Sequence, residues 1–451
     1  MIKVTVDTDG LIEKAFVCRL RYVLDFLQNH PCAPDHLHFS INDFDRADIT
    51  FHYSSKGGSH HIIPQKVYFE PFVNSNLKVV EYEFTYQEHL LKGFAHRGGS
   101  DFMPFDIFET IFFHISRYEE WYASTDQMDE HGTMASKEQY LVKNNLHSIP
   151  VVDLLVLYFY EKVGLIPKKL ETTFTITHDV DVLKKYPSFY KFLRGFGNIM
   201  LYQVNKFSKL FRHLKYYIRY LSGINHDPYD SFDWLLINDH PKITQKILFW
   251  LVGGQTQYEG FFDIHAPDAK NIMSQSKKLG YTIGLHPSYN TIDDLGMMKK
   301  EWHHLNQASE EVINDSRQHF LRFDIKRTSK IVDELGLMTD SSIGYRDTIG
   351  FRCGTGFPYH LYHFDTESSF DFLEIPLIVM DISALRDVNR VNENWGPHIS
   401  DFIEKNKNYT HITFNFHNSF FDPVLVDAAL LKKWYLDTFQ GCSTNSANLS
   451  T

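Results

Sequence analysis

The stretch Thr172–Asp181, TTFTITHDVD, decides the fold of the larger part of this chain. Its apolar and β-branched residues predict a buried strand that runs directly into His178, Asp179 and Asp181. Further apolar runs follow, most of them separated by helix-like stretches: ILFWLVGG (247–254), LGYTIGLHPSYN (279–290), SRQHFLRF (316–323), FLEIPLIVMD (372–381) and HITFNFHNSFFD (411–422). This alternation predicts an α/β protein with a parallel β/α barrel, in which the carboxyl ends of the strands carry the chemistry.

The length of 451 residues is about three times that of a typical domain, so more than one domain is expected. Residues 1–165 are predicted to form an α+β domain. The runs IKVTV, DITFHY and KVYFE predict strands there, and PFDIFETIFFHISRYEEWY predicts a helix. The stretch 151–166 is apolar but interrupted by charges and too short to span a bilayer, which predicts a buried amphipathic helix. Residues 166–451 are predicted to form the barrel, with a helical insertion at about 184–240.

Composition excludes several classes of protein. The formal net charge of −11 argues against nucleic acid as a partner. The four cysteines form no CxxC pair, which excludes a thiolate zinc site and argues against a disulfide framework. The first residues lack the basic start and apolar run of a signal peptide, which predicts a cytoplasmic location. The segment 93–100 has the spacing of a phosphate loop, but Gly99 stands where the required lysine would be, so we reject it as a nucleotide site.

Two carboxylates at the end of the first strand, Asp179 and Asp181, lie two residues apart and should point to the same side. One can hold a divalent metal ion while the other accepts a proton from water. His286 supplies an imidazole of the kind such a metal prefers, and Asn290 could add an amide oxygen. His417, with a pKa near neutrality, could protonate a leaving amine.

The order of these motifs resembles the polysaccharide deacetylase (NodB homology) domain of carbohydrate esterase family 4, over residues from about 170 to 425. The resemblance implies a distorted barrel. THDVD is similar to the first motif of the family, which implies that Asp179 is the catalytic base and Asp181 a metal ligand. HPSYN is similar to the second motif, so His286 matches a metal ligand and Asn290 stands where the family has a second histidine.

The remaining motifs extend the same resemblance. SRQHF is similar to the third motif, whose arginine orients the base, which implies Arg317. LEIP resembles the apolar strand that lines the acetyl pocket, which implies Leu373 and Pro376, and FNFHN is similar to the last motif, with His417 as general acid. The N-terminal region resembles the accessory domain of a subgroup of these enzymes, notably in FDIFETIFFHISRYEE.

Two departures from the family pattern leave alternatives open. With Asn290 in place of histidine, His319 or His178 could supply the missing ligand. Arg346 and Arg352 also lie near the expected active face and compete with Arg317 as the arginine that orients the base. Substrate contacts are expected from the following residues: His178, Tyr289, Arg352, Leu373 and Pro376.

The resemblance implies a hydrolase that removes acetyl groups, above all N-acetyl groups, from amino sugars of a polysaccharide or glycolipid. The expected cofactor is a divalent metal ion, zinc being the first choice. Two alternatives remain: a glycosyltransferase that binds a metal and a sugar nucleotide through Asp179 and Asp181, and a carbohydrate-binding barrel that is catalytically weak.

The predicted insertion has an unusual charge pattern. From Val182 to His226 the chain has no Asp or Glu but nine Lys or Arg residues, interleaved with aromatic and aliphatic ones. This pattern predicts amphipathic helices. They could touch an anionic membrane surface, with a solvated helical hairpin that covers the barrel as the alternative.

Overall fold

The computed structural model describes residues 2–11, 13–54, 60–69, 80–95, 100–202, 205–254, 256–260 and 262–439. Half of the rejected phosphate-loop segment, residues 96–99, lies outside the described residues, as does Cys442. The other three cysteines are free.

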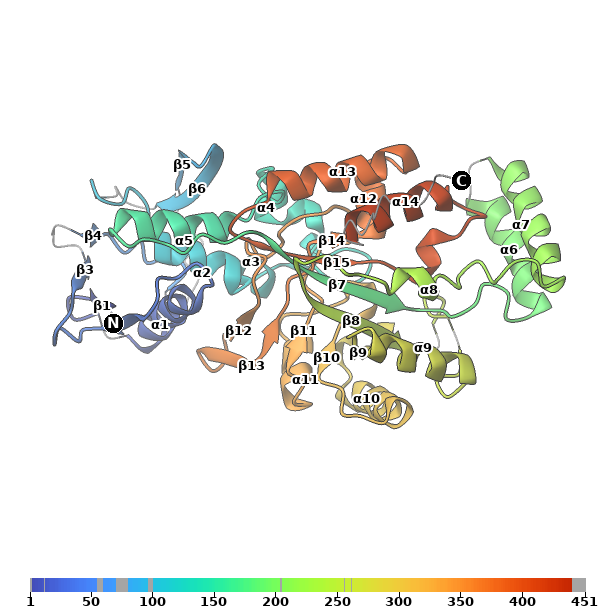
Figure 1. Cartoon of the computed structure of the whole chain (residues 1–451). Helices are drawn as coiled ribbons and strands as arrows, with labels where there is room; N and C mark the ends of the chain where they lie inside the picture. Colours follow the sequence, from blue (N-terminus) through green and yellow to red (C-terminus); the bar gives the residue numbers. More distant parts are fainter. Residues whose placement is uncertain are drawn as a thin grey trace.

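A nine-stranded sheet forms the centre of the larger part of the chain (Figure 1). Its strand order is β12-β13-β11-β10-β9-β8-β7-β15-β14, and every neighbouring pair is parallel except β12 and β13. The strands are β7 (Thr173–Val180), β8 (Ile243–Leu251), β9 (Thr282–His286), β10 (Asp315–Ser316), β11 (Thr339–Asp340), β12 (Tyr359–His363), β13 (Ser368–Glu374), β14 (Val379–Met380) and β15 (His411–Asn415). The predicted α/β class with a large parallel sheet is therefore confirmed.

Strand pairing does not close this sheet into a ring among the described residues, because its order ends at β12 and β14. Strand β14 has only two residues, and both pair with β15. The chain between β13 and β14 bonds instead to the segment after β11, through Leu377 N to Ile343 O, and to strand β15, through Ile378 N to Thr413 O. Strand pairing therefore shows a mainly parallel sheet whose ends do not pair, and the expected distorted barrel stays a prediction.

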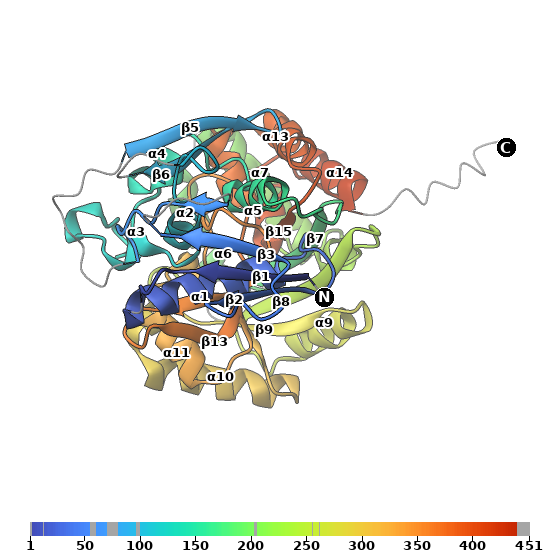
Figure 2. The same cartoon turned by 90° about the vertical axis from the view of Figure 1, so that its left-hand side faces the viewer.

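Helices cover both sides of this sheet (Figures 1 and 2). One side carries α9 (Pro267–Lys278), α10 (Leu295–Ser309) and α11 (Thr328–Glu334), and the other carries α12 (Asp381–Asp387), α13 (Asn392–Lys405) and α14 (Ala428–Phe439). A buried aromatic and aliphatic cluster that includes Ile176, Phe414, Trp395 and Tyr435 packs the second group of helices against β7 and β15. Because parallel strands buried on both faces need apolar residues throughout, the continuous apolar runs of the sequence are explained.

The N-terminal region has its own sheet, ordered β2-β1-β3-β4, with every pair parallel. Its strands are β1 (Ile2–Asp7), β2 (Leu37–Ile41), β3 (Ile49–Tyr53) and β4 (His61–Ile62), and α1 (Lys14–Asn29) connects β1 to β2. A separate antiparallel hairpin joins β5 (Val80–Tyr86) and β6 (His89–Ala95). The predicted α+β class is thus corrected for this region to a parallel sheet with an added hairpin, because the β1–α1–β2 connection crosses over.

Further helices follow in the N-terminal region: α2 (Ile107–Ile115), α3 (Tyr118–Trp121), α4 (Tyr140–Lys143) and α5 (Val151–Lys162), with short 3-10 turns η1 (Thr125–Gln127) and η2 (Ser136–Glu138). Helix α5 is buried on nearly every side, rather than on one face as predicted. The expected strand KVYFE does not form over residues 66–69, because the Glu109 carboxylate accepts the backbone N–H groups of Val67 and Tyr68. Glu70 lies outside the described residues.

The N-terminal region packs tightly against the large sheet. The buried carboxylate of Asp153, in α5, accepts hydrogen bonds from Thr410 Oγ1 at 2.7 Å and from Gly356 N at 3.3 Å. Arg352 donates to Glu120 of α3 at 2.7 and 3.0 Å. One hydrophobic core includes residues from both regions. The domain boundary at about residue 165 stays a prediction.

The insertion after β7 is helical, as predicted. It contains α6 (Phe189–Tyr202), α7 (Lys206–Leu221) and α8 (Phe232–Leu235). Helices α6 and α7 form a hairpin at the end of the molecule opposite the N-terminal sheet (Figure 1). No helix in the described part of the chain combines the length and apolar content needed to cross a bilayer. The expected cytoplasmic location stays a prediction.

Candidate metal and catalytic site

The carboxyl ends of neighbouring strands bring the predicted site residues together. Asp179 lies near the end of β7, and Asp181 follows that strand. His286 ends β9 and His417 follows β15. His178 lies on the opposite side of β7, where its Nδ1 is 3.1 Å from Phe416 O and its Nε2 is 3.2 Å from the Tyr281 hydroxyl. His178 is thus held in the core, and the structure supports neither a ligand role nor a substrate role for it.

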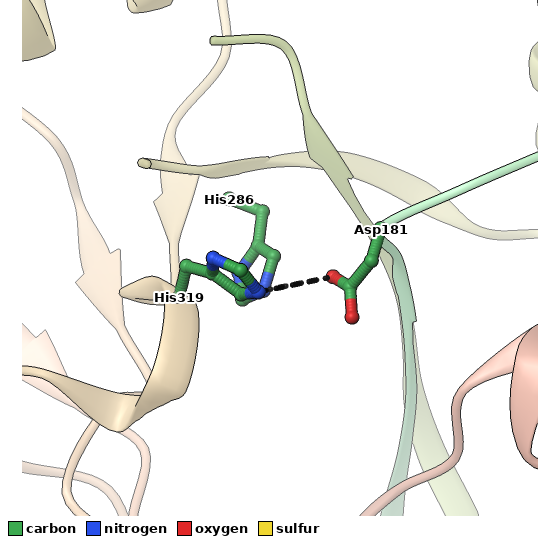
Figure 3. A group of neighbouring side chains, drawn as sticks. All are labelled: Asp181, His286 and His319. Atoms are coloured by element: carbon green, nitrogen blue, oxygen red, sulfur yellow. Dashed lines mark ion pairs between the residues drawn. The ribbon is translucent and has the colours of Figure 1, made fainter. Parts of the chain in front are cut away.

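A group of three side chains could hold a metal ion: Asp181, His286 and His319. One potential ligand atom from each lies within 4.8 Å of the others. The two imidazoles lie side by side and face the Asp181 carboxylate (Figure 3). Asp181 Oδ1 is 3.3 Å from His286 Nε2 and 3.9 Å from His319 Nε2. This oxygen is buried, yet no described group makes a hydrogen bond to it.

The carboxylates beside these two histidines supply negative charge that attracts a cation. His286 Nδ1 donates to Arg317 O at 2.5 Å, which directs its Nε2 toward Asp181. Burial lowers the pKa of His286, but Asp179 and Asp181 outweigh burial and raise it above its usual value. Burial lowers the pKa of His319 to about 4. His319 is therefore neutral near pH 7, as metal binding requires.

His319 replaces Asn290 as the third candidate ligand. Asn290 is exposed in η3 (Tyr289–Asp293), whereas His286 and His319 are buried. His319 begins η4 (His319–Leu321), in which Phe320 adopts a left-handed conformation with φ of 61°. A bulky residue adopts this conformation only where its surroundings impose it. Here the bond from His319 N to Pro287 O, 3.0 Å, ties the turn to the segment that follows β9.

Arg317 holds Asp179 in place. Its Nη1 donates to Asp179 Oδ1 at 3.1 Å, and Asn415 Nδ2 donates to Asp179 Oδ2 at 2.8 Å. The guanidinium is itself fixed by the backbone oxygen and the hydroxyl of Ser341 and lies 4.5 Å from the centre of the Phe249 ring. Burial alone would raise the pKa of Asp179, but Arg317 and the nearby histidines lower it below its usual value. Asp179 is therefore an oriented, ionised carboxylate.

His417 lies on the other side of the two aspartates. Its Nε2 is 3.8 Å from Asp179 Oδ2 and from Asp181 Oδ2. Its Nδ1 donates to Asp381 Oδ1 at 2.9 Å, and its backbone N–H donates to Asp381 Oδ2 at 2.7 Å. Burial lowers the pKa of His417, but the Asp381 carboxylate and the two other aspartates raise it to about 10. The imidazolium can thus hold a proton at neutral pH and direct it toward Asp179.

Asp381 and Asn415 were not identified from the sequence. Asp381 ends the apolar run 372–381 and Asn415 lies within the run 411–422, so their positions were the available signal. Each is hydrogen-bonded to a predicted site residue: Asp381 to His417, and Asn415 to Asp179.

Replacement of Asp381 by Asn should shift the pH profile of turnover. The change removes a negative charge and places an amide N–H₂ beside the donors of His417, so the pKa of His417 falls. We expect the basic limb of kcat/KM to move to lower pH and activity at neutral pH to fall about 10- to 100-fold. A pH–rate profile measures both effects. Asp387→Asn, on the same helix but hydrogen-bonded to His398, is the matched control. An unchanged basic limb in Asp381→Asn would contradict this role for Asp381.

Three other residues predicted to contact substrate, Arg352, Leu373 and Pro376, are poorly placed to do so. Arg352 is buried, and its guanidinium already donates hydrogen bonds to the Glu120 carboxylate and, at 2.8 Å, to Gly344 O. Leu373 lines a pocket with Tyr22 and Phe357, away from the candidate metal ligands, because its neighbour Glu374 takes the opposite face of β13. Pro376 is buried.

Two groups of residues beside the site remain candidates for substrate contact. Tyr289 is 9% exposed and stacks on Tyr258, with ring centroids 4.4 Å apart. A small apolar cluster comprises Leu321, Leu377 and Met380. Leu321 follows His319 by two residues and Met380 precedes Asp381, so this cluster adjoins the candidate site.

A cavity lies beside the candidate ligands rather than on them. It has a volume of about 840 Å³ and begins at Val182, the residue after Asp181. Part of its wall comes from residues 257–260, 262 and 263, and another part from α6 and α7 through Lys191, Arg194 and His213. The α6–α7 hairpin therefore borders a hollow next to the site.

Comparisons with known proteins show distant likenesses. A family model described as "Family of unknown function (DUF7033)" matches residues 11–164. No curated protein matches the chain. Among solved structures, the chain is similar to a protein described as a polysaccharide deacetylase from Mycobacterium smegmatis, with 12% identity over 61% of this chain and 85% of that one and a TM-score of 0.33.

Two further solved structures show likenesses of the same order. A polysaccharide deacetylase from Bacillus cereus is 9% identical over 60% of this chain and 89% of that one, with a TM-score of 0.28. Puue allantoinase is 13% identical over 58% and 82%, with a TM-score of 0.34. Likenesses this distant assign no activity to the chain, so its function has to be inferred from the site.

Proposed function

We propose that this protein is a metal-dependent hydrolase that removes N-acetyl groups from amino sugars of a polysaccharide or glycolipid. The observation that carries the proposal is the arrangement of three groups around one point. These are a cluster of possible ligands (Asp181, His286 and His319), an arginine-held carboxylate (Asp179) and an aspartate-held imidazole (His417). We further propose that the open sheet is a distorted form of the deacetylase barrel, in line with the motif resemblance.

The donor set fits a divalent cation. Two imidazoles and one carboxylate are ligands that zinc commonly takes in catalytic sites, where a further position stays open. The buried Asp181 Oδ1, which no described group hydrogen-bonds, would be satisfied by such an ion. When bound, the ion would supply Lewis acidity, which activates water and polarises the acetyl carbonyl.

The protein's own side chains would handle the protons. Asp179, kept ionised and oriented by Arg317, would accept a proton from the attacking water at one of its carboxylate oxygens. His417 would donate the proton on Nε2 to the departing amine nitrogen, while Asp381 holds its Nδ1–H. The products are acetate and a free amino sugar. Asp179 and His417 thus have the complementary charge states that a base and an acid require near pH 7.

The two alternatives from the sequence are less well supported. The glycosyltransferase alternative gives no catalytic role to the Arg317–Asp179 pair or to the Asp381–His417 pair. A catalytically weak binding protein was suggested by Asn290, but His319 offers a ligand that Asn290 does not.

Acetate release tests the proposed function. The full chain, loaded with zinc, should release acetate from at least one member of a panel of N-acetylated glycans and glycolipids. A chelator should abolish the release, and added zinc should restore it. Acetate release that persists after complete removal of metal would contradict the proposal. So would a metal-loaded protein that binds nucleotide sugars and deacetylates no member of the panel.

A further inference from the structure

We propose that the exposed face of the α6–α7 hairpin docks onto an anionic lipid bilayer. The hairpin is defined here as residues 189–224. The inference rests on the hairpin's exposed apolar residues, on its charge and on its place in the fold, and it does not depend on the proposed enzymatic function.

Helix α7 carries an exposed apolar stripe. Phe207 is 85% exposed and Phe211 is 69% exposed, which is far beyond what a packed side chain shows. Spacings of four and three residues place the members of this stripe on one side of the helix. They are Phe207, Phe211, Leu214, Ile218 and Leu221, and α6 adds exposed Phe189, Tyr190, Leu193, Met200 and Leu201. An exposed apolar surface of this extent marks an interaction site.

The inner side of the hairpin is already packed, so the exposed stripe is not an unfinished core. The rings of Phe192 and Tyr217 stack with centroids 3.7 Å apart, and His213 lies 5.0 Å from Phe192. Gly195 lets the two helices approach closely, because a side chain there would collide with His213. His213 is also bonded to Phe192 O and to the Tyr186 hydroxyl. The hairpin is therefore a formed element with one free apolar face.

The positive charge of the hairpin indicates an anionic partner. The segment from Val182 to His226 contains nine Lys or Arg residues and no Asp or Glu, in a chain whose net charge is −11. Among the described residues no carboxylate forms an ion pair with Lys191, Arg194, Lys206 or Lys215, all of which are exposed. Basic residues beside an exposed apolar stripe match the interface of an anionic bilayer, where the apolar side chains enter the acyl boundary and the cations meet headgroups.

The same features disfavour other partners. A two-fold contact with a second copy would bring the same uncompensated cations face to face. A single-stranded nucleic acid would use aromatic rings for stacking, but the stripe also contains Leu193, Leu214, Ile218 and Leu221, which offer no such surface.

The position of the hairpin in the fold relates membrane docking to the candidate site. It lies at the end of the molecule opposite the N-terminal sheet (Figure 1), and it borders the cavity of about 840 Å³ that begins beside Asp181. A bilayer on the hairpin would therefore lie near this cavity. If the proposed function holds, a glycolipid headgroup would reach the site from the membrane.

Vesicle flotation tests the docking. The full chain should float with vesicles of phosphatidylcholine and phosphatidylglycerol in equal parts and should stay unbound with phosphatidylcholine alone. Binding should weaken as salt is added, because salt screens the headgroup charges. This measurement needs no enzymatic activity, so its failure is distinguishable from failure of the proposed function.

Two pairs of variants separate the apolar and charged contributions. F207S/F211S and K206E/K215E should each weaken binding to the mixed vesicles by about tenfold or more. The matched controls V312S/M338S and K299E/K300E, made at exposed positions elsewhere, should bind as the wild type does. All four variants alter exposed residues, so their melting temperatures should match that of the wild type, which shows that they fold.

Three outcomes would overturn the inference. The first is no binding to mixed vesicles. The second is binding that both hairpin variants retain. The third is a wild-type dimer, seen by sedimentation velocity, that F207S/F211S converts to a monomer, because the stripe would then be an interface between two copies of this chain.

Discussion

Asp179→Asn should retain the bound metal ion and lose turnover by about 10³-fold or more. The substitution keeps the size of the side chain, but an amide cannot accept the proton of the attacking water. The metal ligands Asp181, His286 and His319 are untouched, so zinc content measured by elemental analysis should stay at the wild-type level. Acetate release under saturating substrate measures the loss of kcat.

The control for this variant is Asp401→Asn, which makes the same change at an exposed position in α13. It should leave both metal content and turnover unchanged. Turnover near the wild-type level in Asp179→Asn would remove the base from the proposed mechanism. Loss of metal in the same variant would show instead that Asp179 is a ligand.

His319→Ala should lose the metal ion, whereas Asn290→Ala should keep it. His319 is buried with its Nε2 toward Asp181, and Asn290 is exposed on a neighbouring turn. Removal of a direct ligand should weaken zinc binding by more than the about 10- to 100-fold that is typical for loss of an outer partner. Competition titration with a zinc chelator measures the affinity.

His303→Ala, at an exposed position of α10, controls for the loss of a histidine as such and should bind zinc normally. If Asn290→Ala lost the metal and His319→Ala kept it, the sequence-based assignment would be right and the structural one wrong.

Much of the large sheet could be predicted from the sequence because its strands are buried on both faces. Continuous apolar runs predicted β7, β8, β9 and β15 and placed the polar residues at their carboxyl ends. The alternation along β7 also predicted that Asp179 and Asp181 share a side, and both lie within 4 Å of His417 Nε2. Local pattern was sufficient here because strand geometry fixes the direction of successive side chains.

Other features depended on contacts between distant segments and could not be predicted locally. The choice between Asn290 and His319 depends on the hydrogen bond from His319 N to Pro287 O, which holds His319 beside the segment that follows β9. Asp381 follows an apolar run like several other acids, and only the pairing of β14 with β15 places it against His417. Leu373 was expected near the substrate from the motif resemblance alone, and only the packed structure shows that it lines a pocket with Tyr22 and Phe357.

The most direct test of this account is anomalous diffraction from crystals of the protein grown with zinc. One peak should lie about 2 Å from a carboxylate oxygen of Asp181, from His286 Nε2 and from His319 Nε2. Absence of a peak among these three side chains, in crystals that hold zinc elsewhere or hold none, would contradict it.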